Sequence, residues 1–337
     1  MSDAHLRSGE KAPDRVVENL RAVEIPFFKE MEPAQTVLLA GAGGGFDVFA
    51  ALPLYFWLRG MGKTVHLANL SFSDLAECTG QRPCPEILMV TGVSQGPAAY
   101  FPELALCEWL AKQGIEQPVY AIAKSGVQGV TRAYRSLVHD LRPDTIVLVD
   151  GGTDIVMRGD EPALGTAEED ISSLLGVDCV EGVERKFVAC VGFGVDTYHG
   201  VCHSLFLENT AALIEDGGFL GSWSMTRDME EARLYRSAVD YANLRYPDMP
   251  SIVNNSVACS TEGWYGDRHF SDRTEGTKLF LNPLMSLYWT FRLESLAARL
   301  LYRDQVIGTQ DWRQLAFAID KFRDGLPQLR EWHTIPH

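Results

Sequence analysis

The sequence predicts an α/β protein, a Rossmann-like three-layer sandwich with a mainly parallel sheet. Six short apolar runs rich in β-branched residues recur along the chain without inside/outside alternation, and segments of helical character separate them. Such strands are typical of a parallel sheet that helices cover on both faces. The composition, with 46% hydrophobic and 22% charged residues, excludes a disordered or fibrous chain.

The elements of the first half follow directly from these runs. Each expected strand is a compact apolar segment, from TVLLA to FVACV, and these segments occupy residues 36–40, 64–68, 87–91, 119–123, 145–149 and 187–191. Helices are expected between or before them at 15–23, 46–58, 104–113, 127–141 and 167–175.

The second half has a mainly helical pattern. Helices are expected at 200–215, 225–246, 284–305 and 312–324, with one further strand at 278–281. No repeat, low-complexity tract or Pro/Ser-rich linker marks a boundary. We therefore expect one α/β domain over 1–337, with a Rossmann-like core at 24–216 and a helical cap with the remaining sheet elements at 217–330.

Charge and sulfur content exclude several classes of protein. With 30 Lys+Arg against 45 Asp+Glu, the net charge of −15 does not suit a nucleic-acid partner. The longest apolar stretch, 48–58, falls far short of the roughly 20 residues of a membrane span. Residues 1–14 lack a secretory signal, and the seven scattered cysteines form no C-x-x-C pair. These features predict a cytoplasmic protein and leave a homo-oligomer open.

Glycine and carboxylate recur in the segments that follow the expected strands. These segments are 41–47 (GAGGGFD), 92–96 (GVSQG), 124–126 (KSG), 150–154 (DGGTD) and 192–199 (GFGVDTYH). Ligands of open parallel sheets bind beyond the carboxyl ends of the strands, so the pattern predicts a small-molecule pocket at that edge. The alternative is that each glycine only serves its turn.

The glycine loop is expected to contact the ligand through backbone N–H groups at a helix start, at Gly41, Gly43, Gly44 and Gly45. The dinucleotide fingerprint requires a further glycine where this chain has Phe46, and an acidic residue where it has Asn69. Neither nicotinamide nor flavin binding is therefore expected.

Three aspartates of these segments are candidate metal ligands. Asp47, Asp150 and Asp154 would hold Mg²⁺, Mn²⁺ or Ca²⁺, because these cations prefer oxygen ligands. Alternatively, the same aspartates cap helices and turns.

Catalytic and further binding residues are expected around this site. Asp196 and His199 in one loop would transfer protons with Asp150, since histidine titrates near neutral pH. Polar residues of the same or overlying loops would contact the ligand, namely Ser94, Lys124, Thr153 and Asn254.

Ser94 also supports an alternative, because GVSQG matches the G-x-S-x-G elbow of serine hydrolases. Pro97 and Pro102 disfavour the helix that must follow such an elbow directly.

Four segments, GAGGGFDV, VDGGTDIVMRGDE, GVCHSLFLEN and NPLMSLYWTF, resemble the prokaryotic family catalogued as domain of unknown function 1152. The likeness spans about residues 36–303. It implies a Rossmann-like α/β fold with a loop-built pocket, and it implies no established reaction.

Together these patterns predict a cytoplasmic enzyme that acts on a small polar metabolite. A divalent-metal-assisted hydrolase or lyase is the first hypothesis, with a ribosyl or nucleoside-like substrate preferred because clustered carboxylates bind both cations and vicinal hydroxyls. The alternatives are a non-catalytic small-molecule sensor and a serine hydrolase that uses Ser94.

Overall fold

The computed structural model describes residues 24–277 and 279–335. The helix expected at 15–23 and the first residue of the strand expected at 278–281 lie outside these ranges. Within them, no helix is long and apolar enough to cross a membrane.

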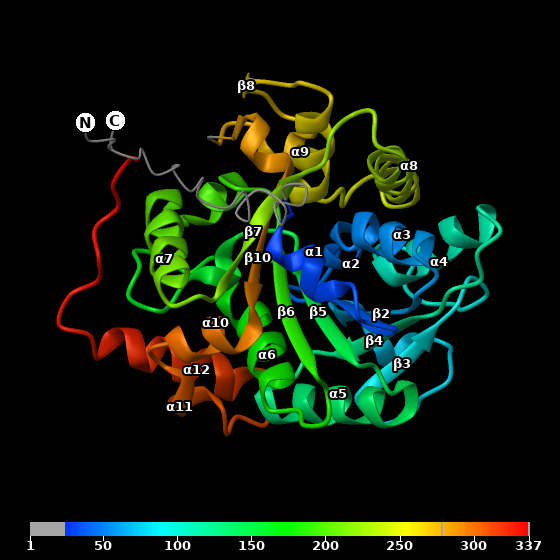
Figure 1. The fold of residues 1–337 in the computed structure, drawn as a ribbon, viewed down its shortest axis with the longest axis horizontal. Coiled ribbons are helices and arrows are strands. Elements are labelled where there is room, and N and C mark those ends of the chain that lie inside the picture. Colours follow the sequence, from blue (N-terminus) through cyan, green and yellow to red (C-terminus); the bar gives the residue numbers. More distant parts are fainter. Residues whose placement is uncertain (1–23, 278, 336–337) are drawn as a thin grey trace, which may run out of the picture.

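An eight-stranded, mostly parallel sheet forms the centre of the molecule (Figure 1). Its five inner strands run parallel in the order β4 (Val119–Ala123), β2 (Thr64–Ser71), β1 (Thr36–Gly41), β5 (Thr145–Asp150) and β6 (Arg185–Cys190). On one side of these strands, β3 (Ile87–Val90) pairs antiparallel with β4. On the other side, β10 (Leu287–Arg292) pairs antiparallel with β6, and β7 (Phe219–Ser224) pairs antiparallel with β10. The predicted fold class is confirmed.

Two helical layers cover the sheet. Alternate residues of a strand face opposite sides, and apolar residues lie on both sides of these strands, so each face packs against helices. In β1, Val37 and Leu39 pack into one apolar core, and Leu38 and Ala40 into the other. The first core includes α1 (Pro26–Met31), α2 (Asp47–Ala50), α3 (Leu52–Gly60), α4 (Pro102–Lys112), α8 (Glu230–Arg245) and part of α9 (Ile252–Thr261). The second includes α5 (Val127–Leu141), α6 (Ala167–Asp178), α7 (His203–Glu215), α10 (Leu293–Arg299), α11 (Arg303–Val306) and α12 (Trp312–Asp324). Figure 1 shows α3, α4 and α8 on one side of the sheet and α5, α6 and α12 on the other.

The second half departs from its predicted elements. The helix expected at 284–305 is wrong, because this stretch begins in a 3-10 turn and continues as β10, α10 and α11. β7 was not expected at all. Within the described part of the strand expected at 278–281, Phe280–Leu281 (β9) is extended, and it pairs with Gly266–Asp267 (β8) outside the main sheet. The segment 217–330 therefore caps the sheet with helices and also extends it by two strands.

The helix expected at 46–58 is divided into α2 and α3 at Ala51. Pro53, which has no N–H to donate, stands in the first turn of α3. As a result α2 is a single short turn that begins at Asp47, directly after the glycine loop.

The predicted site segment 92–96 follows β3, and the direction of β3 sets the edge of the sheet at which this segment begins. Because β3 runs antiparallel to β4, its carboxyl end lies beside Val119, where β4 begins. Thr91, Gly92 and Val93 accordingly line a pocket with 116–118, which precede β4. The prediction that 92–96 joins the other strand-end segments is wrong, because only parallel strands end at the same edge.

The chain order creates a topological switch point between β1 and β5. From β1 the chain moves to β2 on one side, and it later returns to add β5 on the other side. The loops that leave two such strands diverge and open a crevice at their carboxyl ends. The segments after β1 and β5 are 41–47 and 150–154.

Candidate metal centre

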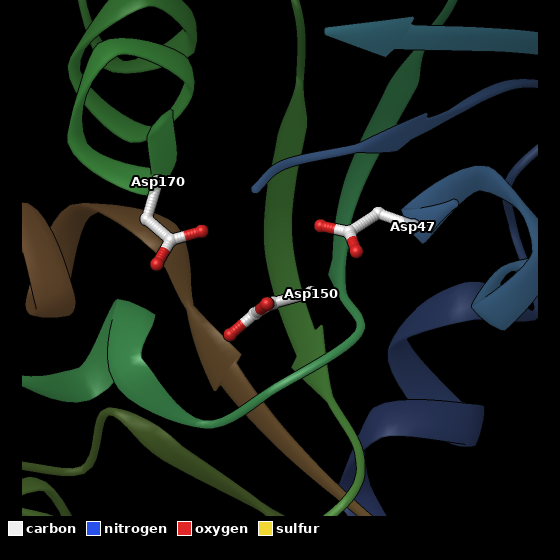
Figure 2. Close-up of side chains that lie close together, drawn as sticks. All are labelled: Asp47, Asp150 and Asp170. Atoms are coloured by element: carbon white, nitrogen blue, oxygen red, sulfur yellow. The ribbon is translucent and has the colours of Figure 1, made fainter. Parts of the chain in front are cut away.

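Three aspartates from different elements meet in this crevice. Asp47 is the first residue of α2, Asp150 the last of β5, and Asp170 lies in the first turn of α6. One carboxylate oxygen from each lies within 4.8 Å of the other two. Figure 2 shows the three side chains directed toward one shared space. We call these three residues the carboxylate cluster.

The glycine loop is built around these carboxylates. Gly44 and Gly45 have φ of +87° and +58°, a left-handed conformation that turns the chain into α2. The Gly43 N–H donates to Asp47 Oδ2 at 2.6 Å. A Cβ on Gly43 would lie 2.6 Å from Asp170 Oδ1 and 2.8 Å from Asp47 Oδ2. Glycine is therefore required here for close approach of the backbone to the cluster.

Asp170 is the residue that sequence reasoning missed. Its side chain is 1% exposed, and within the described residues neither of its carboxylate oxygens accepts a hydrogen bond. The signal was its position in α6, where Ala167, Ile171 and Leu174 form the buried face at helical spacing. Asp170 belongs to that face, and a carboxylate in an apolar stripe is unusual enough to mark a functional position.

Two further aspartates border the cluster and are held by threonines. Asp154 Oδ2 accepts from the backbone N–H of Thr166 at 2.7 Å and from its hydroxyl at 3.1 Å. Asp196 Oδ2 accepts from the N–H of Thr153 at 2.6 Å and from its hydroxyl at 3.1 Å. We call Asp154 and Asp196 the outer carboxylates. Asp154, an expected metal ligand, thus lies beside the carboxylate cluster, and Asp170 is the third member of the cluster in its place.

Gly152 lies where the outer carboxylates meet the cluster. A Cβ built on it would lie 2.8 Å from Asp154 Oδ1 and 3.2 Å from both Asp150 Oδ1 and Asp196 Oδ1. The expected convergence of Asp47, Asp150, Asp154 and Asp196 at one edge is therefore present in the structure.

Burial and mutual repulsion act together on these groups. Burial raises the pKa of every carboxyl in the cluster and of both outer carboxylates. Repulsion from neighbouring carboxylates raises the pKa of the three cluster aspartates and of Asp196 further. Glu169, adjacent to Asp170, has its pKa raised to about 7, mainly by burial. A group of buried carboxylates requires either bound protons or a bound cation.

Two exposed, positively chargeable side chains act on the acidic groups of the site. His199, in the 3-10 turn Val195–His199 (η4), is exposed, and its charge lowers the pKa of Asp154. Lys124 follows β4, and its charge lowers the pKa of Glu169. Both predicted site residues therefore lie within electrostatic reach of the acidic groups.

Asn254 and Ser94 occupy different surroundings. Asn254 is buried in α9, where its Nδ2 donates to the Phe46 carbonyl at 3.1 Å and its Oδ1 accepts from the Tyr235 hydroxyl at 2.9 Å. It supports the end of the glycine loop, and protein groups already occupy its amide. Ser94 lies in the turn after β3, where its Oγ accepts from the Thr91 N–H at 3.0 Å. Because α4 begins only at Pro102, no strand–elbow–helix forms there.

Fold and site together define a class: a Rossmann-like α/β protein with a buried three-carboxylate cluster at the sheet's switch point. The family model "Protein of unknown function (DUF1152)" matches residues 98–320. This is more than half of the chain, so the chain belongs to that family. The match contains Asp150 and Asp170 and begins after the glycine loop. No curated protein sequence matches the chain.

Proposed function

We propose that this protein is a divalent-metal-dependent enzyme that acts on a small polar metabolite, with the cation held by Asp47, Asp150 and Asp170. The observation that carries the proposal is the Asp170 carboxylate. It is buried, directed at two other carboxylates, and without a hydrogen-bond donor in the described part of the chain. A cation between the three groups would satisfy it and would offset their repulsion.

The donor set favours a hard cation. All three groups contribute carboxylate oxygens, and neither a histidine nor a cysteine belongs to the set found among the described residues. Mg²⁺, Mn²⁺ and Ca²⁺ prefer such ligands, whereas zinc sites favour imidazole and thiolate. Three protein ligands also leave coordination positions for water and substrate.

A hydrolase or lyase agrees best with this arrangement. A bound divalent cation polarises a carbonyl or phosphoryl oxygen and activates water. His199, which is exposed, would exchange protons with the substrate, and Thr153 holds Asp196 in place. The outer carboxylates are acceptors for hydroxyl groups, which supports the ribosyl or nucleoside-like substrate expected from the sequence.

The metal site is tested by titrating chelator-treated protein with Mn²⁺, followed by calorimetry and by the thermal midpoint. The native protein should bind Mn²⁺, and Asp170→Asn should weaken that affinity by at least about tenfold, or about 1.4 kcal/mol. Glu103→Gln is the matched control, because Glu103 is another fully buried carboxyl that lies outside the cluster. It should leave Mn²⁺ affinity unchanged.

Two results would contradict the metal site. One is the absence of any response to Mg²⁺, Mn²⁺ or Ca²⁺, and the other is equal Mn²⁺ affinity in Asp170→Asn and the native protein. Either would mean that the carboxylates hold shared protons instead of a cation.

Turnover is tested separately, with the Mn²⁺-loaded protein and a panel of nucleosides and sugar phosphates. Released base or phosphate should appear with a member of the panel and should disappear in Asp150→Asn. Ligand binding to the panel without any turnover would contradict the enzyme and would favour the non-catalytic sensor.

A further inference from the structure

A pocket opens at the edge of the sheet where the parallel strands end. It has a volume of about 610 Å³ and lies beyond the carboxyl ends of β2 and β4, with Ser71 at the end of β2 and Lys124 just after β4. The 3-10 turn Leu75–Glu77 (η2) and Arg82 form another part of its wall. We call this the anion pocket, for the reasons that follow. Its size is in the range typical of small-metabolite sites.

The charge inside this pocket is opposite to that of the carboxylate cluster. Arg82 and Lys124 line it, and neither forms a salt bridge within the described residues. Asp74, its one acidic lining residue, accepts a hydrogen bond from the Ala76 N–H at 3.0 Å. Ser71 and Ser73 add hydroxyl groups to the lining. In a chain of net charge −15, two such cations together indicate an anionic ligand.

Lys124 is held in place by aromatic rings. Its Nζ lies 4.6 Å from the ring centroid of Phe72 and 4.1 Å from that of Trp312. Contacts of this kind orient an ammonium group and leave its N–H groups available to an acceptor. Arg82 donates to the Leu75 carbonyl through Nη2, which fixes the guanidinium at the wall.

Phe72 links the anion pocket to the glycine loop beside the carboxylate cluster. The Phe72 ring under Lys124 also packs against the glycine loop, since a Cβ on Gly44 would lie 2.4 Å from it. Gly44 in turn accepts a hydrogen bond from the Asp47 N–H at 3.1 Å. Phe72 therefore connects Lys124 and the anion pocket with the loop that leads to Asp47.

We infer that the anion pocket binds a phosphate or carboxylate group of the substrate through Lys124 and Arg82, while the rest of the substrate extends toward the carboxylate cluster. The identity of the ligand as substrate rests on the proposed function. The substrate class is thus a small metabolite with an oxyanion at one end.

Titration with inorganic phosphate and, separately, with malonate tests this inference and distinguishes the two oxyanions. Calorimetry on metal-free and Mg²⁺-loaded protein gives the affinity, and the fluorescence of Trp312 reports the location because its ring contacts Lys124. Trp312→Phe identifies that signal. At least one probe should bind and change the fluorescence.

The variants are Lys124→Gln, Arg82→Gln and Lys124→Arg. Each glutamine variant should raise the dissociation constant of the bound probe about tenfold, the usual effect of losing a charged hydrogen bond, and Lys124→Arg should recover part of it. Lys112→Gln is the matched control, because Lys112 also lies over a ring, 4.2 Å from the centroid of Tyr241, and outside this pocket. It should change the affinity less than about twofold.

The outcomes separate this inference from the proposed function. If neither probe binds, or if the affinity is the same in both glutamine variants and the native protein, the anion pocket is refuted even where Mn²⁺ binds normally. If a probe binds with the expected dependence on Lys124 and Arg82 while no divalent cation binds, the anion pocket holds and the metal-dependent enzyme does not.

Discussion

At the scale of single residues, the carboxylate cluster depends on the glycines that lie against it as much as on its aspartates. Asp47 and Asp150 could be predicted because Asp150 ends a buried strand and Asp47 lies in the segment that follows another, and strand ends of a parallel sheet meet at one edge. Asp170 could not be placed in the same way. It lies in a helix, and the approach of α6 to the glycine loop depends on packing that the local sequence does not encode.

Gly43→Ala should disturb the cluster sterically. Its φ is not in the left-handed region, so the added methyl group acts mainly through contacts of 2.6 and 2.8 Å with two carboxylate oxygens. We expect a loss of about 1–3 kcal/mol in the free energy of unfolding and weaker Mn²⁺ binding, measured by urea denaturation and calorimetry.

Gly60→Ala is the control for this substitution, because a Cβ at Gly60 would meet no atom within 4 Å. It should leave both quantities within about 0.5 kcal/mol. Unchanged Mn²⁺ affinity in Gly43→Ala would show that the loop does not position the metal ligands.

His199→Gln should separate chemistry from metal binding. The histidine is exposed, its charge acts on Asp154, and it is not one of the three cluster residues. With a substrate found in the panel above, we expect kcat to fall by roughly 10²-fold, as for loss of a general acid or base, with Mn²⁺ affinity preserved. Undiminished kcat would remove His199 from the reaction.

At the scale of elements, the inner strands and β3 were predictable from the sequence, and β7 and β10 were not. The inner strands are buried on both faces and appear as continuous apolar runs. β7 and β10 are partly exposed. The six residues of β10 (LYWTFR) mix aromatic and polar side chains in a pattern that agrees with the periodicity of a helix as well as with that of a strand. The direction of β3 could not be predicted either, because a short apolar run has no polarity of its own.

Helix α9 supports the site through a hydrogen bond to the glycine loop. Asn254 of α9 donates to the Phe46 carbonyl and so supports the residue that links the glycine loop to Asp47. Asn254→Ala should cost about 1–3 kcal/mol in the free energy of unfolding, because it leaves buried polar groups unpaired. It should also speed amide hydrogen exchange across 43–47.

Asn255→Ala serves as the comparison for Asn254→Ala. Asn255, its neighbour in α9, exchanges hydrogen bonds with Asn243 in α8 and does not contact the loop. It should be destabilising without faster exchange at 43–47. Equal exchange in the two variants would mean that α9 does not support the glycine loop.

At the scale of the whole molecule, the acidic groups link stability to pH. Burial raises the pKa of Glu103 from its ordinary 4.5 to about 7, and the cluster aspartates also have raised pKa values. Between these pH values the folded protein retains protons that the unfolded chain releases. For Glu103, the metal-free protein should therefore lose stability as pH rises through about 4.5 to 7, and the cluster aspartates, whose pKa values are raised well above 3.8, should add to this loss.

Urea midpoints in chelator at about pH 5 and about pH 8 measure this effect, which for Glu103 alone is on the order of a few kcal/mol. Glu103→Gln should stabilise the protein at the higher pH and change little at the lower one, since glutamine resembles the protonated acid and can keep the hydrogen bond from Asn69. Mn²⁺ should oppose the trend, because metal binding replaces protons and strengthens with pH. Stability that rises with pH in chelator would contradict these pKa directions.

The fold class and the edge that carries the site were therefore available from the sequence, since both follow from strand pattern and from the residues at strand ends. The third ligand, the orientation of β3 and the anion pocket depend on contacts between distant segments. Arg82 reaches the pocket from the connection between β2 and β3, where nothing in the local pattern distinguishes it from a solvated surface residue.

The ligands of the carboxylate cluster come from β5, α2 and α6, and they share one space only when the sheet and both helical layers have assembled. The ion would consequently find its complete site at the end of folding. Mn²⁺ should slow unfolding and leave the refolding rate nearly unchanged, so that the cation lengthens the lifetime of the native molecule without guiding its formation.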